Sequence, residues 1–278
     1  MNGMQSVQAV QTVCTAGAAV FLLFAPEVAT DMIPEMAVPH SAGYRLTGLL
    51  LIGLTLIYAA GVVTNDYMLA AATSLGRLTT IPMIIAAIML LRAPPVLALS
   101  VVPDVLLALV AFYFVQKEGA HLIQARGLDS EESKPELLAR LFLAFAGGLD
   151  MVEGAFMVAD PTKYSEYPII ANPYLLKGPK FFGLRIYGCA LFIIGGYQLA
   201  SMASRSPGLI YAACGAYHLI FAAGLYFLAP LIGDPQLGKE INHPLYHVPL
   251  GLLVFIFAIN IPRSAAVAPP ASEHTKKE

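Results

Sequence analysis

Long runs of apolar residues alternate with shorter polar stretches along this chain. A run of about 17 to 25 predominantly apolar residues is long enough to cross a bilayer as an α-helix. Eight such runs are present, and they predict an all-α integral membrane protein with eight transmembrane helices. The predicted helices cover residues 8–25, 44–63, 68–91, 95–116, 138–158, 181–201, 207–230 and 244–262.

The second half of the chain repeats the first half. Three short segments return in the same order at offsets of 140, 136 and 146 residues. Apolar helices share a composition, so one match alone means little, but three matches in register predict two copies of a four-helix unit. The matched segments are Arg45-Leu-Thr-Gly48 with Arg185-Ile-Tyr-Gly188, Ile84-Ile-Ala-Ala-Ile-Met-Leu90 with Ile220-Phe-Ala-Ala-Gly-Leu-Tyr226, and Pro103-Asp-Val-Leu-Leu107 with Pro249-Leu-Gly-Leu-Leu253.

The duplication predicts how the chain is organised. We expect a first four-helix repeat at 1–118, a polar linker at 119–136, a second four-helix repeat at 137–262 and a disordered tail at 263–278. An even number of helices in each repeat gives both repeats the same orientation, so they are parallel-related. Both termini then lie on one face, which carries seven Lys and Arg residues against five on the other. This bias favours cytoplasmic termini.

The composition agrees with a membrane location and excludes several functions. Hydrophobic residues make up 58% of the chain and charged residues only 12%, whereas soluble proteins are about 25% charged. The net charge of −2 offers no basic surface for nucleic acid. No phosphate-binding loop or dinucleotide fingerprint is present, so no nucleotide partner is expected either. The expected partners are the lipid bilayer and a lipophilic small molecule, and homo-oligomer formation is left open.

One predicted helix in each repeat begins with Arg-x-x-Gly, followed by apolar residues and a further glycine. This pattern covers Arg45 to Gly53 in the first repeat and Arg185 to Gly195 in the second. It resembles the second helix of DoxX-like small membrane proteins. The resemblance implies a four-helix bundle in each repeat, but it implies no activity and carries over no functional residue. Two units in one chain depart from the single unit of that family.

Ionisable residues inside predicted spans need a partner or a purpose, because each costs about 2.5 to 3.5 kcal/mol on insertion scales. In the first repeat, Arg77 and Asp104 reach a similar depth on neighbouring helices. We expect a structural ion pair that fixes how these helices pack. The aligned positions of the second repeat hold Ala213 and Leu250, so that repeat lacks the pair.

The second repeat instead carries two carboxylates, Asp150 and Glu153, on one face of a predicted helix. Two carboxylates this close in a low dielectric do not both ionise easily, and a carboxylic acid kept protonated can act as a general acid. Counted along the predicted helices, His247 reaches the same depth as these carboxylates, and His218 lies deeper. We predict that one of Asp150 and Glu153 donates a proton, that the other modulates it, and that His218 or His247 is the base.

Substrate-binding residues are predicted beside this group. Arg185 would be an electrostatic anchor, while Tyr187, Tyr217 and Tyr246 would line a pocket for a flat or unsaturated ligand. The simpler alternative is that Arg185 forms a salt bridge with Asp150 or Glu153, and that the tyrosines are ordinary core and interfacial residues.

The carboxylates and histidines could also ligate zinc or iron. No Glu-x-x-His or His-Glu-x-x-His run is present, so the sequence alone assigns no metal and no cofactor. The first hypothesis is a membrane-embedded isomerase or cyclase that transfers protons on a lipophilic molecule such as an isoprenoid or polyketide. The second is a proton-coupled small-molecule transporter, whose site would draw on both repeats. The third is a structural subunit of a membrane complex.

Overall fold

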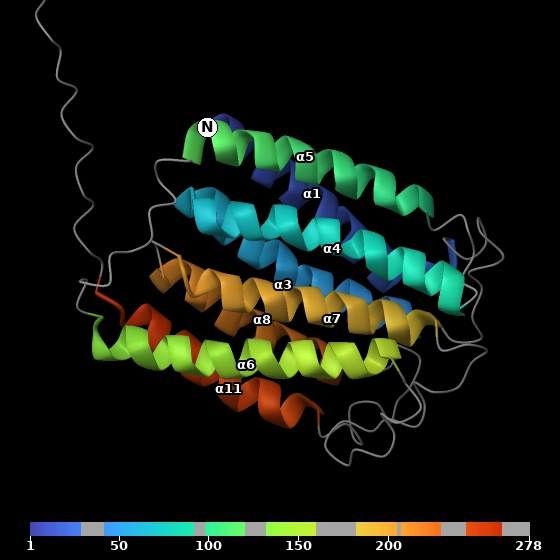
Figure 1. Ribbon diagram of the computed structural model, residues 1–278. Coiled ribbons are helices and arrows are strands. Elements are labelled where there is room, and N and C mark those ends of the chain that lie inside the picture. The colour runs from blue at the N-terminus through green and yellow to red at the C-terminus, as the bar shows by residue number, and fades with distance from the viewer. Residues whose placement is uncertain are drawn as a thin grey trace, which may run out of the picture.

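The computed structural model describes residues 1–28, 42–91, 98–119, 132–159, 182–204, 207–228 and 243–262. These ranges form eight α-helices and no strand. The helices run side by side along a common direction (Figure 1). They are α1 (Gly3–Phe24), α3 (Ala42–Thr64), α4 (Tyr67–Leu91), α5 (Ala98–Gly119), α6 (Lys134–Ala159), α7 (Phe182–Ser201), α8 (Pro207–Phe227) and α11 (His243–Ile259).

Each predicted segment corresponds to one helix, and the largest difference in a boundary is at the start of α1. This helix begins five residues earlier than predicted because polar groups satisfy its first N–H groups. The side chain of Asn2 accepts a hydrogen bond from the backbone N–H of Gln5, and Glu118 accepts from those of Gly3 and Met4. The predicted tail at 263–278 lies outside the described residues.

The start of α6 also differs from the prediction. The helix begins at Lys134, inside the stretch expected to be linker. Ser133 precedes it, and its hydroxyl accepts a hydrogen bond of 3.4 Å from the backbone N–H of Glu136, as a residue at a helix start does. Most of the expected linker lies outside the described residues.

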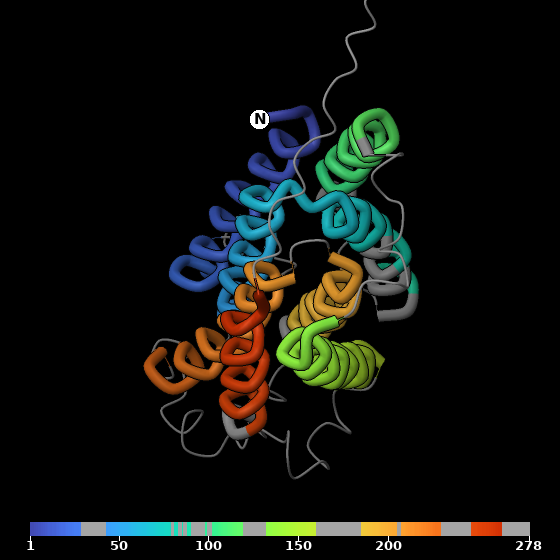
Figure 2. Tube along the Cα trace, turned by 90° about the vertical axis from the view of Figure 1, so that its left-hand side faces the viewer, coloured from blue at the N-terminus to red at the C-terminus, as the bar shows by residue number. Residues whose placement is uncertain are grey.

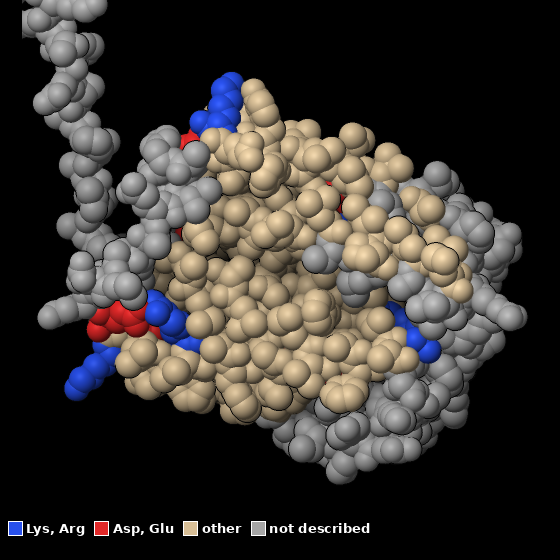
Figure 3. Space-filling model, in the orientation of Figure 1, with Lys and Arg blue, Asp and Glu red and all other residues tan. Residues whose placement is uncertain are grey.

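Four helices of the described part of the chain are long and apolar enough to cross a membrane. They cover Gly3–Phe24, Gly43–Thr64, Lys134–Ala159 and Pro207–Phe227. Figure 3 shows charged side chains gathered at the two ends of the helices, with a largely uncharged surface between them. These features indicate a membrane protein. The described ranges therefore do not support the prediction of eight transmembrane helices, since four qualify and α11 has only 17 residues.

The two halves of the chain pack in the same way. In the first half, α1 packs on α3 and α5, and α4 packs on α5; in the second, α6 packs on α7 and α11, and α8 packs on α11. Between the halves, α3 lies against α8, α4 lies against α7, and α3 and α7 contact each other. Figures 1 and 2 show the first half above the second, and α1 and α6 both start at the same end of the bundle.

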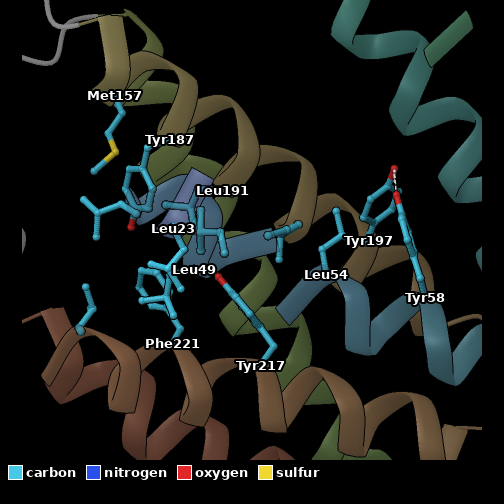
Figure 4. Packing of buried hydrophobic residues seen from close by; sticks show 14 residues of the cluster. Leu23, Leu49, Leu54, Tyr58, Met157, Tyr187, Leu191, Tyr197, Tyr217 and Phe221 are labelled. Atoms are coloured by element: carbon cyan, nitrogen blue, oxygen red, sulfur yellow. Dashed lines mark hydrogen bonds between the residues drawn. The ribbon is translucent and has the colours of Figure 1, made fainter. Parts of the chain in front are cut away.

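The largest buried apolar cluster joins the two halves where α3, α7 and α8 meet (Figure 4). Tyr217 of α8 enters a notch in α3 at Gly53, where an added Cβ would lie 2.1 Å from the tyrosine ring. The Tyr187 and Phe221 rings are stacked 6.3 Å apart. Because lipid is as apolar as these side chains, close packing rather than water exclusion holds the helices together here.

The arginine of each Arg-x-x-Gly motif caps the end of the preceding helix. Nη1 of Arg45 donates a hydrogen bond of 2.8 Å to the carbonyl of Leu23, the last residue but one of α1. Nη1 of Arg185 donates in the same way to the carbonyl of Val158, the last residue but one of α6. A positive charge at this end interacts favourably with the negative end of the helix dipole. The guanidinium also donates to carbonyls that have no hydrogen-bond partner within the helix.

The glycine of each motif lets that helix approach the preceding one closely. A Cβ on Gly48 would lie 2.8 Å from the carbonyl oxygen of Ala19, and a Cβ on Gly188 would lie 2.9 Å from that of Gly154. Leu23 and Val158, like Ala19 and Gly154, are 135 residues apart. The contacts therefore align α1 with α6 at an offset of 135.

Candidate functional site

The first half contains a polar group formed by α3, α4, α5 and α7. Nη1 of Arg77 lies 2.5 Å from Oδ1 of Asp104, which pairs α4 with α5. The guanidinium also lies 6.0 Å from the centroid of the Tyr58 ring. The Tyr58 hydroxyl donates to that of Tyr197 from the second half, and Tyr197 donates to the carbonyl of Thr73 (Figure 4). This group helps to fix the helices across the boundary between the halves.

The second half contains a larger buried group, centred on Asp150 of α6. Oδ2 of this carboxylate accepts a hydrogen bond of 2.7 Å from Nε2 of Gln198 on α7. It also accepts a longer one of 3.3 Å from the hydroxyl of Tyr217 on α8. Asp150 and Gln198 are both 0% exposed. The carboxylate is therefore oriented by donors from two other helices.

The chain of hydrogen bonds continues from Gln198 to two histidines. Oε1 of Gln198 lies 2.9 Å from Nε2 of His218, and Nδ1 of His218 lies 2.6 Å from Nδ1 of His247 on α11. The amide oxygen can only accept, so Nε2 of His218 carries a proton. A neutral His218 then accepts at Nδ1 from the Nδ1–H of His247. In this series of hydrogen bonds, from His247 through His218 and Gln198, every donor therefore points toward Asp150.

Glu153 lies one turn further along α6, with its own partner. Its Oε2 accepts a hydrogen bond of 2.7 Å from the Tyr246 hydroxyl, and the residue is 4% exposed. The Tyr246 ring stacks on the His247 ring at 4.1 Å between centroids. Glu153 and the Asp150 chain therefore meet at the start of α11. This arrangement brings a second carboxylate and a phenol next to the two imidazoles.

Aromatic rings cover one side of the histidine pair. The Tyr217 ring lies 4.6 Å from the His218 ring, and the Phe221 ring lies 4.9 Å from the His247 ring. His218 itself lies eleven residues after the start of α8 and nine before its end. A helix of this length places such a residue near the middle of the membrane. The polar group is thus surrounded by apolar and aromatic side chains.

The Asp150 carboxylate has one oxygen without a hydrogen-bond partner among the described residues. Both hydrogen bonds to Asp150 end on Oδ2, while Oδ1 is buried and has no hydrogen-bond partner within the described part of the chain. No lysine or arginine described by the structure forms an ion pair with Asp150 either. A buried carboxylate oxygen without a donor is costly, and it requires an explanation.

The first half has no equivalent of this group. The offsets between paired helices align Asp150 with Thr15, His218 with Pro82 and His247 with Val101. Gln198 aligns with Tyr58, which belongs to the Arg77 group. Each half therefore carries a polar group of a different chemical kind. The acid and base candidates all belong to the second half.

The structure brings together most of the residues predicted from the sequence, and it shows Arg185 in contact with the end of α6. Asp150, Glu153, His218, His247, Tyr217 and Tyr246 form the connected group described above, and the Tyr187 ring packs on Phe221 at its edge. The Arg185 guanidinium lies at the end of α6, on the carbonyls of Val158 and Ala159.

Gln198 is the member of the group that the sequence did not reveal. Its side chain is neutral, whereas the predicted site residues are ionisable or aromatic. A polar amide among apolar residues at a span position was the available signal, because such a group needs a hydrogen-bond partner inside the membrane.

No family model, no curated protein and no solved structure matches the chain.

Proposed function

We propose that the protein is a membrane-embedded enzyme that transfers protons on a lipophilic small molecule, in an isomerisation or cyclisation. The observation that carries this proposal is the buried group of two carboxylates, two imidazoles and two phenols within the second half. Such groups supply proton donors and acceptors where bulk water does not compete.

In this proposal Glu153 and Tyr246 exchange the proton with the substrate. Their hydrogen bond of 2.7 Å gives the carboxylate a neighbour that can pass a proton to it or stabilise its charge. The chain from His247 through His218 and Gln198 to Asp150 holds the charges beside it in place. The burial of Glu153 among apolar helices favours a substrate that dissolves in lipid, such as an isoprenoid or a polyketide.

The location of the group favours an enzyme over a transporter. Transporters built from repeats place the substrate site where the repeats meet, with residues from both. Asp150, Glu153, Gln198, His218 and His247 all come from α6, α7, α8 and α11. Where Tyr217 of the group packs on the first half at Gly53, that position has no polar side chain.

We also propose that all eight helices cross the membrane, as two parallel-related four-helix repeats. The helices α4, α5 and α7 have 25, 22 and 20 residues, enough for a hydrocarbon core about 30 Å thick. They lie alongside the four apolar helices (Figure 1). The equivalent packing of the two halves supports the duplication.

Proton transfer can be tested without knowing the substrate. Membranes that contain the protein would be incubated in D2O with a lipophilic extract of the source cells, and mass spectrometry would follow deuterium uptake into each compound. We expect the wild-type protein to label at least one compound. Glu153→Gln should lower that rate by at least about 100-fold, since a positioned acid or base contributes roughly this much.

Glu118→Gln is the matched control, because Glu118 is a carboxylate of the first half that caps α1. It should label the compound at the wild-type rate. A folded Glu153→Gln variant with undiminished labelling would refute the proposal. Absence of any labelled compound with the wild-type protein would count against it and favour a structural role for the group.

A further inference from the structure

We propose that Asp150, His218 and His247 bind a divalent transition-metal ion of the zinc or iron class. One ligand atom from each of these residues lies within 4.8 Å of the other two, and all three residues are 0% exposed. Two imidazole nitrogens and one carboxylate oxygen are a donor set that such ions prefer, with further positions left for water or a substrate. The three residues come from α6, α8 and α11, so the site has no local sequence motif.

The unpartnered oxygen of Asp150 is an independent observation that points to a cation. Gln198 and Tyr217 both donate to Oδ2, and they orient the carboxylate while Oδ1 keeps its lone pairs. A metal ion on Oδ1 would satisfy this buried atom and neutralise a carboxylate that has no Lys or Arg ion-pair partner in the described ranges.

Gln198 supplies the hydrogen bond that a metal-binding histidine needs. Ligating histidines donate the other ring N–H to an oxygen acceptor, which fixes the ring and its tautomer. Nε2 of His218 donates to Oε1 of Gln198 over 2.9 Å, and this leaves the Nδ1 lone pair of His218 toward His247. The same amide orients Asp150 through its other end. One side chain thus positions two of the three ligands.

The geometry requires a small change on binding. The two Nδ1 atoms lie 2.6 Å apart, the separation of a hydrogen bond. Two nitrogens bonded to zinc at about 2.0 to 2.1 Å in a tetrahedral arrangement lie roughly 3.3 Å apart. The rings would therefore separate by somewhat less than about 1 Å, and the proton on Nδ1 of His247 would move to Nε2 of the same ring, which leaves a lone pair on each Nδ1 for the metal.

The site adjoins the proposed acid and base without using them. Glu153 is not one of the three ligands, and its hydrogen bond to Tyr246 can persist with the metal in place. The inference concerns the same buried group as the proposed function, but metal content is measured without a substrate, so each proposal can fail alone.

The test is metal analysis of the full-length protein purified in detergent without chelators. We expect about one zinc or iron ion per chain in the wild-type protein, and at least about a tenfold loss in His247→Gln and in Asp150→Asn. Glu118→Gln should keep the wild-type content. Equal metal content in the wild-type protein and both site variants would overturn the inference.

A second measurement needs no variant. The wild-type protein would be stripped of metal and dialysed against Co2+, whose visible absorption bands report nitrogen and oxygen ligands. We expect bands that saturate at about one equivalent and disappear on competition with zinc. A protein that takes up neither zinc nor cobalt would overturn the metal site, and continued deuterium labelling would leave the acid and base proposal standing. Metal binding without any labelling would have the reverse meaning.

Discussion

Hydrogen bonds between side chains determine which residues of this protein belong together. Gln198 joins Asp150 to His218, so one neutral residue connects a carboxylate with two imidazoles. Gln11 of α1 is just as buried, yet both polar atoms of its side chain have no hydrogen-bond partner among the described residues. The two side chains are chemically identical, but only that of Gln198 has hydrogen-bond partners among the described residues. Substitutions at the two positions can therefore be compared directly.

Gln198→Leu should lower the free energy of unfolding by about 1 to 3 kcal/mol, because Asp150 and His218 each lose a partner while remaining buried. Gln11→Leu should leave it unchanged or raise it, since a buried amide without partners is replaced by an apolar side chain of similar size. Reversible unfolding in mixed detergent micelles measures both. A larger loss from Gln11→Leu than from Gln198→Leu would contradict this account.

At the residue scale, the sequence predicted side chains that are charged and missed partners that are not. Asp150, Glu153, His218 and His247 stood out because ionisable groups are rare in apolar helices. Arg185 stood out for the same reason, but its hydrogen-bond acceptors are backbone carbonyls at the end of α6. Every residue has a backbone carbonyl, so the sequence does not reveal which carbonyls accept hydrogen bonds from side chains. An arginine that caps a helix therefore looks the same in the sequence as one that binds a substrate.

Helix pairs form the next scale, and glycines set how closely they approach. A Cβ on Gly154 of α6 would lie 2.5 Å from the carbonyl oxygen of Gly188 and 2.5 Å from the backbone nitrogen of Phe192, both on α7. Gly148 lies on the same helix, and a Cβ there would meet nothing within 4 Å. The approach of α6 to α7 also brings Asp150 within reach of Gln198.

Gly154→Ala should destabilise the protein by about 1 to 3 kcal/mol, because backbone atoms of α7 would have to move. Gly148→Ala should stabilise it by about 0.5 to 1 kcal/mol, since alanine loses less conformational freedom in a helix than glycine. Thermal unfolding in detergent compares the two variants. Equal stability of both would show that α6 and α7 are not packed as closely as described.

At the element scale, the order and extent of the helices could be predicted because each is an apolar run bounded by polar residues. The first turn of α1 was missed since it is polar and depends on Glu118, more than a hundred residues away in sequence. Which helices touch could not be predicted either. The apolar pattern is the same whichever helices are paired. Which helices pack together depends instead on glycines that let a neighbouring side chain approach, such as Gly53.

The whole molecule has two ends, and side chains define one of them. The amide of Asn2 donates to Asn65, and the hydroxyl of Ser204 donates to Asp66. The start of α1 and the connections after α3 and α7 therefore lie at one end, where α11 also finishes (Figure 1).

Single cysteines in a background without the three native ones would test whether α4 and α11 cross the membrane. Val63→Cys and Asn260→Cys should react with a membrane-impermeant thiol reagent from one side, and Met89→Cys and Phe227→Cys from the other. Val63, Met89 and Phe227 are 73%, 75% and 74% exposed, so they are accessible at the two ends. Labelling of Val63→Cys and Met89→Cys from the same side would exclude a crossing by α4.

The exchange of neighbours between the halves has a consequence for the origin of the chain. In the contact between the halves, α3 lies against α8, and its counterpart α7 lies against α4. The two halves therefore bury equivalent surfaces against each other. A single four-helix ancestor with that surface would have paired with a second identical copy. Under the proposed duplication, fusion into one gene would make this pairing permanent and would let each copy acquire different polar residues. Such divergence would account for the histidines in one half and the ion pair in the other.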